Sequence, residues 1–346
     1  LLASAADETA RAELVSAIGR PVESARQDAL ELIDVLRAGE STTAALGLWA
    51  CKDIPLHEEW VSHLPSGVVG TLTDQEALDQ WASRETDGLI KKFPLDLTPA
   101  TAIVLASALA AKVKWCKPFD SHPRRGQVSR DDPGPPAEQW LNRVTYNLAD
   151  AAVLDGAVTR VVIAGDGDVD VHLVLGDSQP ADALAAGLRE LSGKAQVRPA
   201  AELDGGPGFA VHHRESSRPD DMLHVKLPSF EIAVRHDLMK QADLFGLHAV
   251  SDRITSHLPL LSPAPLYVSK GAQSVLARFF AEGFEAAAVT AFGIAVTGAP
   301  PEDRYTITYV DVDFDRPFGF IAVHRPSRLA VVAGWVNSPF REGSQG

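Results

Sequence analysis

The hydrophobic periodicity of the chain changes along its length, and this change restricts the fold more than any single motif does. Apolar residues recur at helical spacing over residues 7–38 and again from Asp74 to Gly88. After Leu223 the apolar residues mostly alternate with polar ones, which is the pattern of half-buried strands. Helices that come first and strands that come late predict an α+β protein with large, mainly antiparallel sheets.

This pattern predicts individual elements. We expect two helices within residues 7–38, separated by Gly19-Arg20-Pro21, and a further helix from Pro180 to Leu191. The apolar run of residues 101–113 fits a strand buried on both faces, although its alanine content would also allow a helix. Ser121 to Pro136 reads as a surface loop. The other expected strands are Thr42–Ala50, Val158–Ile163, Val169–Leu175, His224–Leu227, Glu231–Val234, Leu266–Ser269, Tyr305–Asp313, Phe318–His324 and Leu329–Val336.

Charge and cysteine content exclude several classes of function. The 346 residues carry 46 Asp and Glu against 32 Lys and Arg, a formal charge of −14, which would repel nucleic acid and anionic lipid. No apolar stretch approaches the ~20 residues that a membrane span needs. Cys51 and Cys116 are far apart and outside any CxxC pair, so we expect two buried thiols rather than a zinc or redox site.

Two polar segments resemble metal sites only superficially. Asp166, Asp168, Asp170 and Asp177 have the spacing of EF-hand ligands, but Val171 stands where that loop needs glycine. We therefore expect a hairpin turn with solvated carboxylates.

The adjacent histidines His212 and His213 lie in a polar stretch with Arg214, and we expect a surface loop there rather than a metal site. No nucleophile elbow, Walker loop, HExxH or Gly-x-Gly-x-x-Gly motif occurs in the chain. We accordingly expect neither an enzyme nor a cofactor, and we assign no catalytic residue and no metal ligand.

Residues 281–299 form the most informative segment, because they are small and nearly uncharged and alternate in size. The bulkier even positions are Phe284, Ala286, Ala288, Thr290, Phe292, Ile294 and Val296. The odd positions are Glu285, Ala287, Val289, Ala291, Gly293, Ala295 and Thr297. Such alternation predicts a strand with one buried face, and an ordinary alanine-rich helix or strand is the alternative.

This segment resembles the hinge of serpins, a family of serine protease inhibitors of the suicide type. The matching hinge residues are Gly283, Glu285, Ala286, Ala287, Ala288 and Thr290. The resemblance extends over essentially the whole chain in the right order. It includes Trp81, Thr86, Lys112, Trp115, Leu227-Pro-Ser-Phe-Glu-Ile232, Pro265-Leu-Tyr-Val-Ser-Lys270, Phe314-Asp-Arg-Pro-Phe318, Gly334 and Asn337.

The resemblance implies a single serpin domain over residues 1–346, with three β-sheets, eight or nine helices and an exposed reactive-centre loop at about residues 281–313. A target protease would cut this loop, and the hinge would then insert into the central sheet as a new strand. The family's first helix and first strand would precede Leu1. A chain that starts on Leu, and a composition typical of bacteria, favour a bacterial cytoplasmic protein that begins inside a longer sequence, with secretion left open.

The family's spacing, counted from Gly283, implies a reactive bond between Thr297 and Gly298. Small and aliphatic residues beside that bond suit an elastase-like or subtilisin-like target better than a trypsin-like one. A cut after Phe292 or Ile294 is the alternative. We expect a monomer, with loop-sheet polymers as a second form.

Departures from the family pattern leave the activity open. Phe284 stands where inhibitory members carry a small residue, and burial of its ring is expected to clash or to slow insertion. Ala281 and Ser229 replace both partners of a salt bridge, and Gln273 and Ser107 replace the His and Asn of a polar latch. The alternatives to an inhibitor are therefore a non-inhibitory serpin, acting as a binding or carrier protein or a plain protease substrate, and a truncated gene product.

Overall fold

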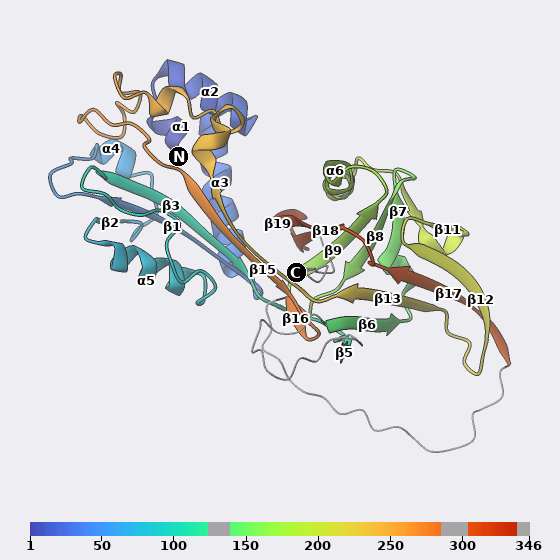
Figure 1. Cartoon of the computed structure of the whole chain (residues 1–346). Helices are drawn as coiled ribbons and strands as arrows, with labels where there is room; N and C mark the ends of the chain where they lie inside the picture. The colour runs from blue at the N-terminus through green and yellow to red at the C-terminus, as the bar shows by residue number, and fades with distance from the viewer. Residues whose placement is uncertain (124–138, 285–303, 338–346) are drawn as a thin grey trace, which may run out of the picture. The chain divides into compact units, whose positions relative to one another are not determined.

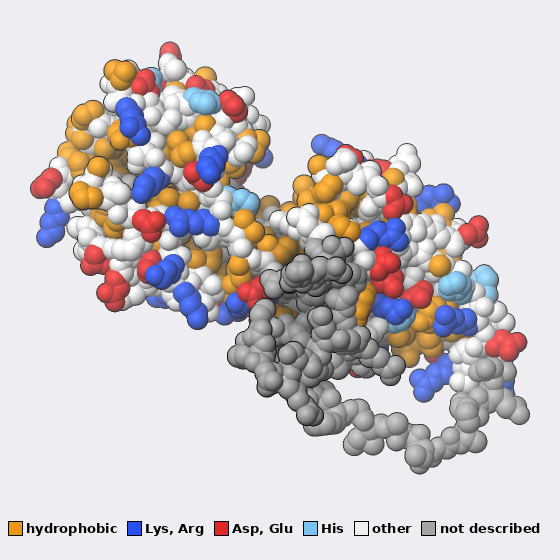
Figure 2. Space-filling view, viewed as in Figure 1, with side chains coloured by type: hydrophobic (Ala, Val, Ile, Leu, Met, Phe, Trp, Pro, Cys, Tyr) orange, Lys and Arg blue, Asp and Glu red, His pale blue; other side chains and the backbone are white. Residues whose placement is uncertain are grey.

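The computed structural model describes residues 1–123, 139–284 and 304–337 (Figure 1). The chain forms two compact units. The first consists of residues 1–110 and 233–276, and the second of residues 111–232 and 277–346. Both units contain helices and strands, which confirms the α+β class. On the face seen in Figure 2, acidic and basic side chains are interspersed over both units.

The first unit holds most of the helices. The helix α2 begins after Asp7, whose carboxylate accepts a hydrogen bond from Ala10 N, and ends at Gly19 in the left-handed conformation (φ 71°). The two helices expected within residues 7–38 are thereby confirmed. The helical elements of this unit are α1 (Leu2–Ala5), α2 (Glu8–Ile18), α3 (Val22–Ala38), α4 (Glu58–Val61), α5 (Gln75–Glu85), η3 (Leu238–Gln241), α7 (Ala242–Phe245) and η4 (Ala249–Ser251).

A three-stranded sheet in the order β2-β1-β3 accompanies these helices. Its strands are β1 (Thr42–Ala50), β2 (Val69–Thr71) and β3 (Ile103–Ala111), so the apolar run of residues 101–113 contains a strand and no helix. Trp49, Trp81 and Phe93 pack edge to face, with centroids 5.0 to 6.4 Å apart, in the core between this sheet and α5.

The second unit contains two six-stranded sheets. The first has antiparallel pairs throughout and is made of β10 (Val197–Pro199), β7 (Ala151–Leu154), β8 (Val158–Ile163), β9 (Val169–Gly176), β18 (Phe318–His324) and β19 (Leu329–Val336), in this order. The helix α6 (Pro180–Leu191), which has the expected bounds, covers it through Ala183 and Ala186 (Figure 1). Short turns η1 (Leu148–Asp150) and η2 (Ala200–Glu202) flank its strands.

The other six-stranded sheet is mixed, because β13 pairs with β17 in parallel. Its order is β11 (Gly205–Gly206), β12 (Phe209–Ser216), β17 (Tyr305–Asp313), β13 (Met222–Pro228), β6 (Gln139–Thr145) and β5 (Asp120–Pro123). The inner faces of both six-stranded sheets share one buried core, to which Leu173, Leu223 and Val310 each contribute a fully buried side chain. Burial of one face of each sheet is the main stabilising contribution in this unit.

A fourth sheet has the order β14 (Phe230–Asp237), β15 (Ala272–Phe279), β16 (Gly283–Phe284) and β4 (Val113–Lys114). The described residues thus form seven α-helices and four sheets, compared with the expected eight or nine helices and three sheets.

Three local predictions are wrong. The segment Leu266–Ser269 is not a strand, because Val268 N bonds to Val250 O and Leu266 N to Ser256 Oγ instead of a neighbouring strand. His212 and His213 lie in β12, not in a loop, since β17 pairs with them residue by residue. Of the two expected buried thiols, Cys116 is exposed and Cys51 half-buried.

Candidate functional site

The described part of the predicted hinge is the two-residue strand β16, made of Gly283 and Phe284. The remaining predicted hinge and bond residues lie outside the described residues: Glu285, Ala286, Ala287, Ala288, Thr290, Thr297 and Gly298. The candidate site is therefore built from β16 and from the elements that hold it.

The strand β16 lies between two others. It runs antiparallel to β15, with Phe284 opposite Phe279, and antiparallel to β4, with Phe284 opposite Val113 and Gly283 opposite Lys114. A tight turn connects β15 to β16, and Phe280 N donates to Gly283 O across it at 2.9 Å. The start of the hinge is thus already an interior strand of this sheet.

The ring of Phe284 is buried, with 2% of the residue exposed. It faces Phe320 of β18 at 6.1 Å between centroids, and Phe320 in turn lies 5.2 Å from Phe230. These rings belong to an aromatic cluster that consists of Trp115, Phe119, Phe230, Phe279, Phe284, Phe314, Phe318 and Phe320. The sequence suggested a ring that would clash on entering the sheet, whereas β16 places it among other rings, where each pair contributes about 0.5–1.5 kcal/mol beyond burial.

Glycine at position 283 is required by a close approach of backbones. A Cβ on Gly283 would overlap the carbonyl oxygen of Val113 in the adjacent strand. The preceding turn is held from the same side, because Trp115 N donates to Glu282 O at 2.9 Å and Phe119 N to Ala281 O at 2.8 Å. The Trp115 indole also donates to Phe280 O at 2.9 Å. These three hydrogen bonds hold the turn that precedes the two hinge residues.

The far edge of β4 is fixed by an ion pair that the sequence did not reveal. Trp115 forms an isolated bridge to Gly165, whose N–H donates to Asp170 at 3.0 Å. Asp170 also accepts two hydrogen bonds from the Arg325 guanidinium, at 2.7 and 2.8 Å, and this contact raises the pKa of Arg325. The expectation of solvated carboxylates is thus wrong for Asp170, which is 8% exposed.

A buried cation borders the aromatic cluster. The guanidinium of Arg143 lies 4.7 Å from the Phe119 ring centroid and donates to Lys117 O at 3.4 Å. Burial lowers the pKa of Arg143 to about 10, so the side chain stays protonated near neutral pH. Arg143 therefore contributes a buried, charged side chain to the packing at this end of the cluster.

The departures from the family pattern are locally accommodated. Ala281 is buried and Ser229 bonds to Gln139 through both N–H (2.8 Å) and Oγ (3.1 Å), so no charge is left unpaired there. Gln273 of β15 and Ser107 of β3 are both exposed.

The chain that follows the undescribed segment enters the sheet as β17. Arg304 N donates to Ser216 O at 2.9 Å, and β17 pairs with β12 on one side and β13 on the other. The downstream end of the predicted loop is thus anchored in an interior strand.

In the described ranges, no group of three or more His, Cys, Asp or Glu side chains could hold a metal ion.

None of the described helices is both long enough and apolar enough to cross a membrane.

The aromatic cluster was missed by sequence reasoning. Phe318 and Phe320 occupy alternate positions of one strand, and this pattern could have marked them as buried partners for another ring. The pattern does not say which ring, because Phe284 and Phe320 are far apart in the sequence.

Comparison with known proteins agrees with this architecture. The family profile "Serpin (serine protease inhibitor)" matches residues 210–339. A "Serine protease inhibitor" from Cyanea capillata is 21% identical over 270 residues, which cover 76% of this chain and 64% of that protein. A "Leukocyte elastase inhibitor" from Equus caballus is 30% identical over 131 residues, which cover 36% of this chain and 33% of that protein.

A solved structure of "thyroxine-binding globulin complex with thyroxine" has the same fold. The TM-score is 0.69 at 17% identity, and the match covers 98% of this chain and 89% of that one. The chain spans 64% and 66% of the length of the first two curated relatives that it matches. The family profile, the curated relatives and the shared fold all agree with the resemblance of this chain to serpins.

Proposed function

We propose that this serpin inhibits a serine-type endopeptidase by offering its reactive-centre loop, at about residues 281–313, as bait. Cleavage of the loop would let the hinge insert into the sheet that already contains β16. The observation that carries this proposal is the place of β16, which occupies an interior position between β15 and β4. The remaining hinge residues, from Glu285 onward, come directly after β16 in the sequence.

The register of β16 specifies where the inserted residues would pair. Phe284 is opposite Phe279 of β15 and Val113 of β4 in antiparallel pairs. Each step forward along the hinge is therefore one step back along its neighbours. Continued in this way along β15, Thr290 would stand opposite Gln273, one of the positions that the sequence marked as a polar latch.

The same register predicts which face would be buried. Side chains alternate along a strand, so after insertion the even hinge residues would share the face of Phe284, which is buried. Ala288 and Thr290 would thus face the core, and Ala287 would face away from it. This assignment matches the size alternation that the sequence shows in this segment.

The length of β3 supports a reactive bond at Thr297–Gly298. In the continued register, the nine residues of β3 would pair with hinge residues 286–294. Cleavage after Thr297 would leave enough chain to fill all of these positions. Cleavage after Phe292 would leave Ile103 and Val104 without partners.

The proposed partner is an elastase-like or subtilisin-like serine protease. Val296 and Thr297 are small or aliphatic, whereas a trypsin-like pocket selects Arg or Lys. The name of the horse relative, a leukocyte elastase inhibitor, supports this class of target. We propose that the whole chain acts as one serpin domain and as a monomer.

A second candidate function is that of a non-inhibitory serpin, which binds a ligand or is simply cleaved. The buried ring of Phe284 favours it, because the aromatic cluster ties the start of the loop to the sheet before any cleavage. The thyroxine-bound globulin with the same fold shows that a binding function occurs on this scaffold.

The test is incubation of the full chain with subtilisin, elastase, chymotrypsin and trypsin at equal molar ratio, followed by denaturing gels and mass spectrometry. Inhibition predicts a covalent band at the summed mass and a released peptide that begins at Gly298. Complete cleavage with the protease still active would contradict the inhibitory proposal and favour the second candidate.

A further inference from the structure

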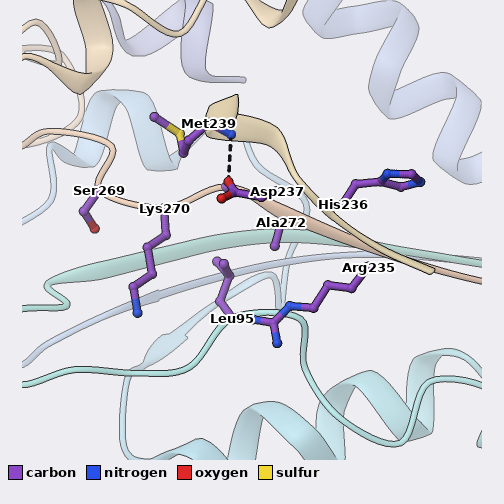
Figure 3. A pocket seen from close by; sticks show the side chains of 9 residues that line it. Leu95, Arg235, His236, Asp237, Met239, Ser269, Lys270 and Ala272 are labelled. Carbon is purple, nitrogen blue, oxygen red and sulfur yellow. Dashed lines mark hydrogen bonds between the residues drawn. The ribbon is translucent and has the colours of Figure 1, made fainter. Parts of the chain in front are cut away.

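A separate cavity of about 440 Å³ lies within the first unit (Figure 3). The end of β14 and the start of η3 form one wall, residues 269–272 form a second, and Leu95 forms a third. We call this cavity the β14 pocket. Its volume lies in the range of about 300–1,000 Å³ that is typical of small-molecule sites.

Hydrogen bonds fix the walls of the β14 pocket. Leu238 N donates to Gly271 O at 2.8 Å, which ties the first wall to the second. Asp237 uses its carboxylate to cap η3, by accepting from Met239 N at 3.0 Å (Figure 3). Such connections between separate chain segments indicate a pocket formed before any ligand binds.

The third wall is anchored by α5. Gln75 Nε2 donates to Leu95 O at 3.1 Å, and Gln75 Oε1 accepts from Leu97 N at 2.8 Å. The side-chain amide of Gln75 thus holds the backbone on both sides of Asp96. The Asp96 carboxylate itself is paired with Arg235.

Two cations from different walls converge on this anchored segment. Lys270 Nζ donates to Asp96 O at 2.9 Å, and Arg235 Nη2 lies 3.6 Å from Asp96 Oδ2. In Figure 3 the Arg235 side chain extends toward Leu95, the Lys270 side chain lies on the other side of Leu95, and His236 points away from both. The Asp96 side chain is 80% exposed, so its contact with Arg235 is a loose surface pair that water weakens.

From this arrangement we infer that the β14 pocket binds a small molecule with one compact anionic group, such as a carboxylate, on an apolar body. The Asp96 carboxylate, which lies beside Arg235, would compete with the ligand's anion for that guanidinium. The ligand's carboxylate would bond to Arg235 and Lys270, because a guanidinium and an ammonium donate strong charge-assisted hydrogen bonds. Its apolar body would contact Leu95, Met239 and Ala272.

Isothermal titration calorimetry of the full chain at pH 7.5, with decanoate as the probe and decan-1-ol as its uncharged analogue, tests this inference. We expect one decanoate site. Arg235→Gln and Lys270→Gln should each weaken binding about fivefold, because each removes one charged donor. Asp96→Asn should tighten binding by about threefold, because it removes the internal competitor.

Lys240→Gln is the matched control, since Lys240 is an exposed residue of η3 outside the pocket, and it should leave the affinity for decanoate unchanged. Decan-1-ol should bind more weakly than decanoate and respond to none of the charge variants. The inference is overturned if decanoate does not bind, or if Asp96→Asn weakens binding or leaves it unchanged. The site is separate from the reactive-centre loop, so the result does not depend on protease inhibition.

Discussion

The ring of Phe284 lies 6.1 Å from the ring of Phe320, with an interplanar angle of 50°. Phe284 is the second residue of the predicted hinge, and Phe320 belongs to β18 in the core of the second unit. The contact joins the start of the loop to the aromatic cluster. Substitution of Phe284 is therefore expected to change both the stability of the native protein and the insertion of its loop.

Replacement of Phe284 by alanine should destabilise the protein. Removal of a buried ring costs about 3 kcal/mol at the low end for core phenylalanines, and the two-residue strand β16 can relax around the change. We expect the melting temperature to fall by about 5 °C in a thermal scan. Ile254→Ala is the control, because Ile254 is 95% exposed and its loss should leave the melting temperature nearly unchanged. Equal effects of the two substitutions would contradict the role of the cluster.

A glutamate placed at Ala288 should abolish inhibition, whereas one at the adjacent Ala287 should not. If the register of β16 continues along the inserted hinge, residue 288 would face the core and residue 287 would face away from it. Burial of an unpaired carboxylate costs several kcal/mol. We expect Ala288→Glu to be cleaved without a covalent complex, and Ala287→Glu to retain the complex on denaturing gels. The reverse order would show that the register does not continue from β16.

Cleavage of the loop should stabilise the protein. Insertion would bury the even hinge residues, at about 25 cal/mol per Å² of apolar area, and would add a ladder of backbone hydrogen bonds. We expect the melting temperature to rise by at least about 10 °C after limited cleavage between Thr297 and Gly298. The cleaved Ala288→Glu variant is the internal control and should show no comparable rise. An unchanged melting temperature of the cleaved parent chain would exclude insertion.

The free energy of unfolding should decrease when the pH falls from about 6.5 to about 4. Burial, and after it the positive charge of Arg160, lower the pKa of His172 to about 4, although the nearby Glu190 carboxylate acts in the opposite direction. Above pH 6.5 the imidazole is neutral in both states and contributes nothing to this dependence. Below it the unfolded chain gains a proton that the folded chain does not, and the loss approaches roughly 3 kcal/mol at pH 4.

Urea titrations of the parent chain and His172→Gln across this pH range isolate that contribution, because glutamine does not titrate. The parent should lose more stability than the variant does. His63→Gln, which changes an exposed histidine, should follow the parent. Parallel curves for the parent and His172→Gln would contradict the buried neutral imidazole.

The local pattern of apolar and polar residues was sufficient to predict most of the helices and strands. The strands expected at Tyr305–Asp313, Phe318–His324 and Leu329–Val336 have the observed bounds. The reason is that strand alternation and helical spacing depend on neighbours in the sequence. Leu266–Ser269 was wrong because a strand also needs a partner, and its backbone groups bond to Ser256 and η4 instead.

By itself, the sequence determined the α+β class, the family resemblance and the alternation of residues 281–299, all of which are properties of order and spacing along one chain. Only the tertiary structure decided that Phe284 packs against Phe320, that Asp170 is buried against Arg325, and that Arg235 and Lys270 converge on Asp96. The physical reason is that burial and pairing are set by whichever distant residue the fold brings to within a few ångströms. No local pattern encodes that partner.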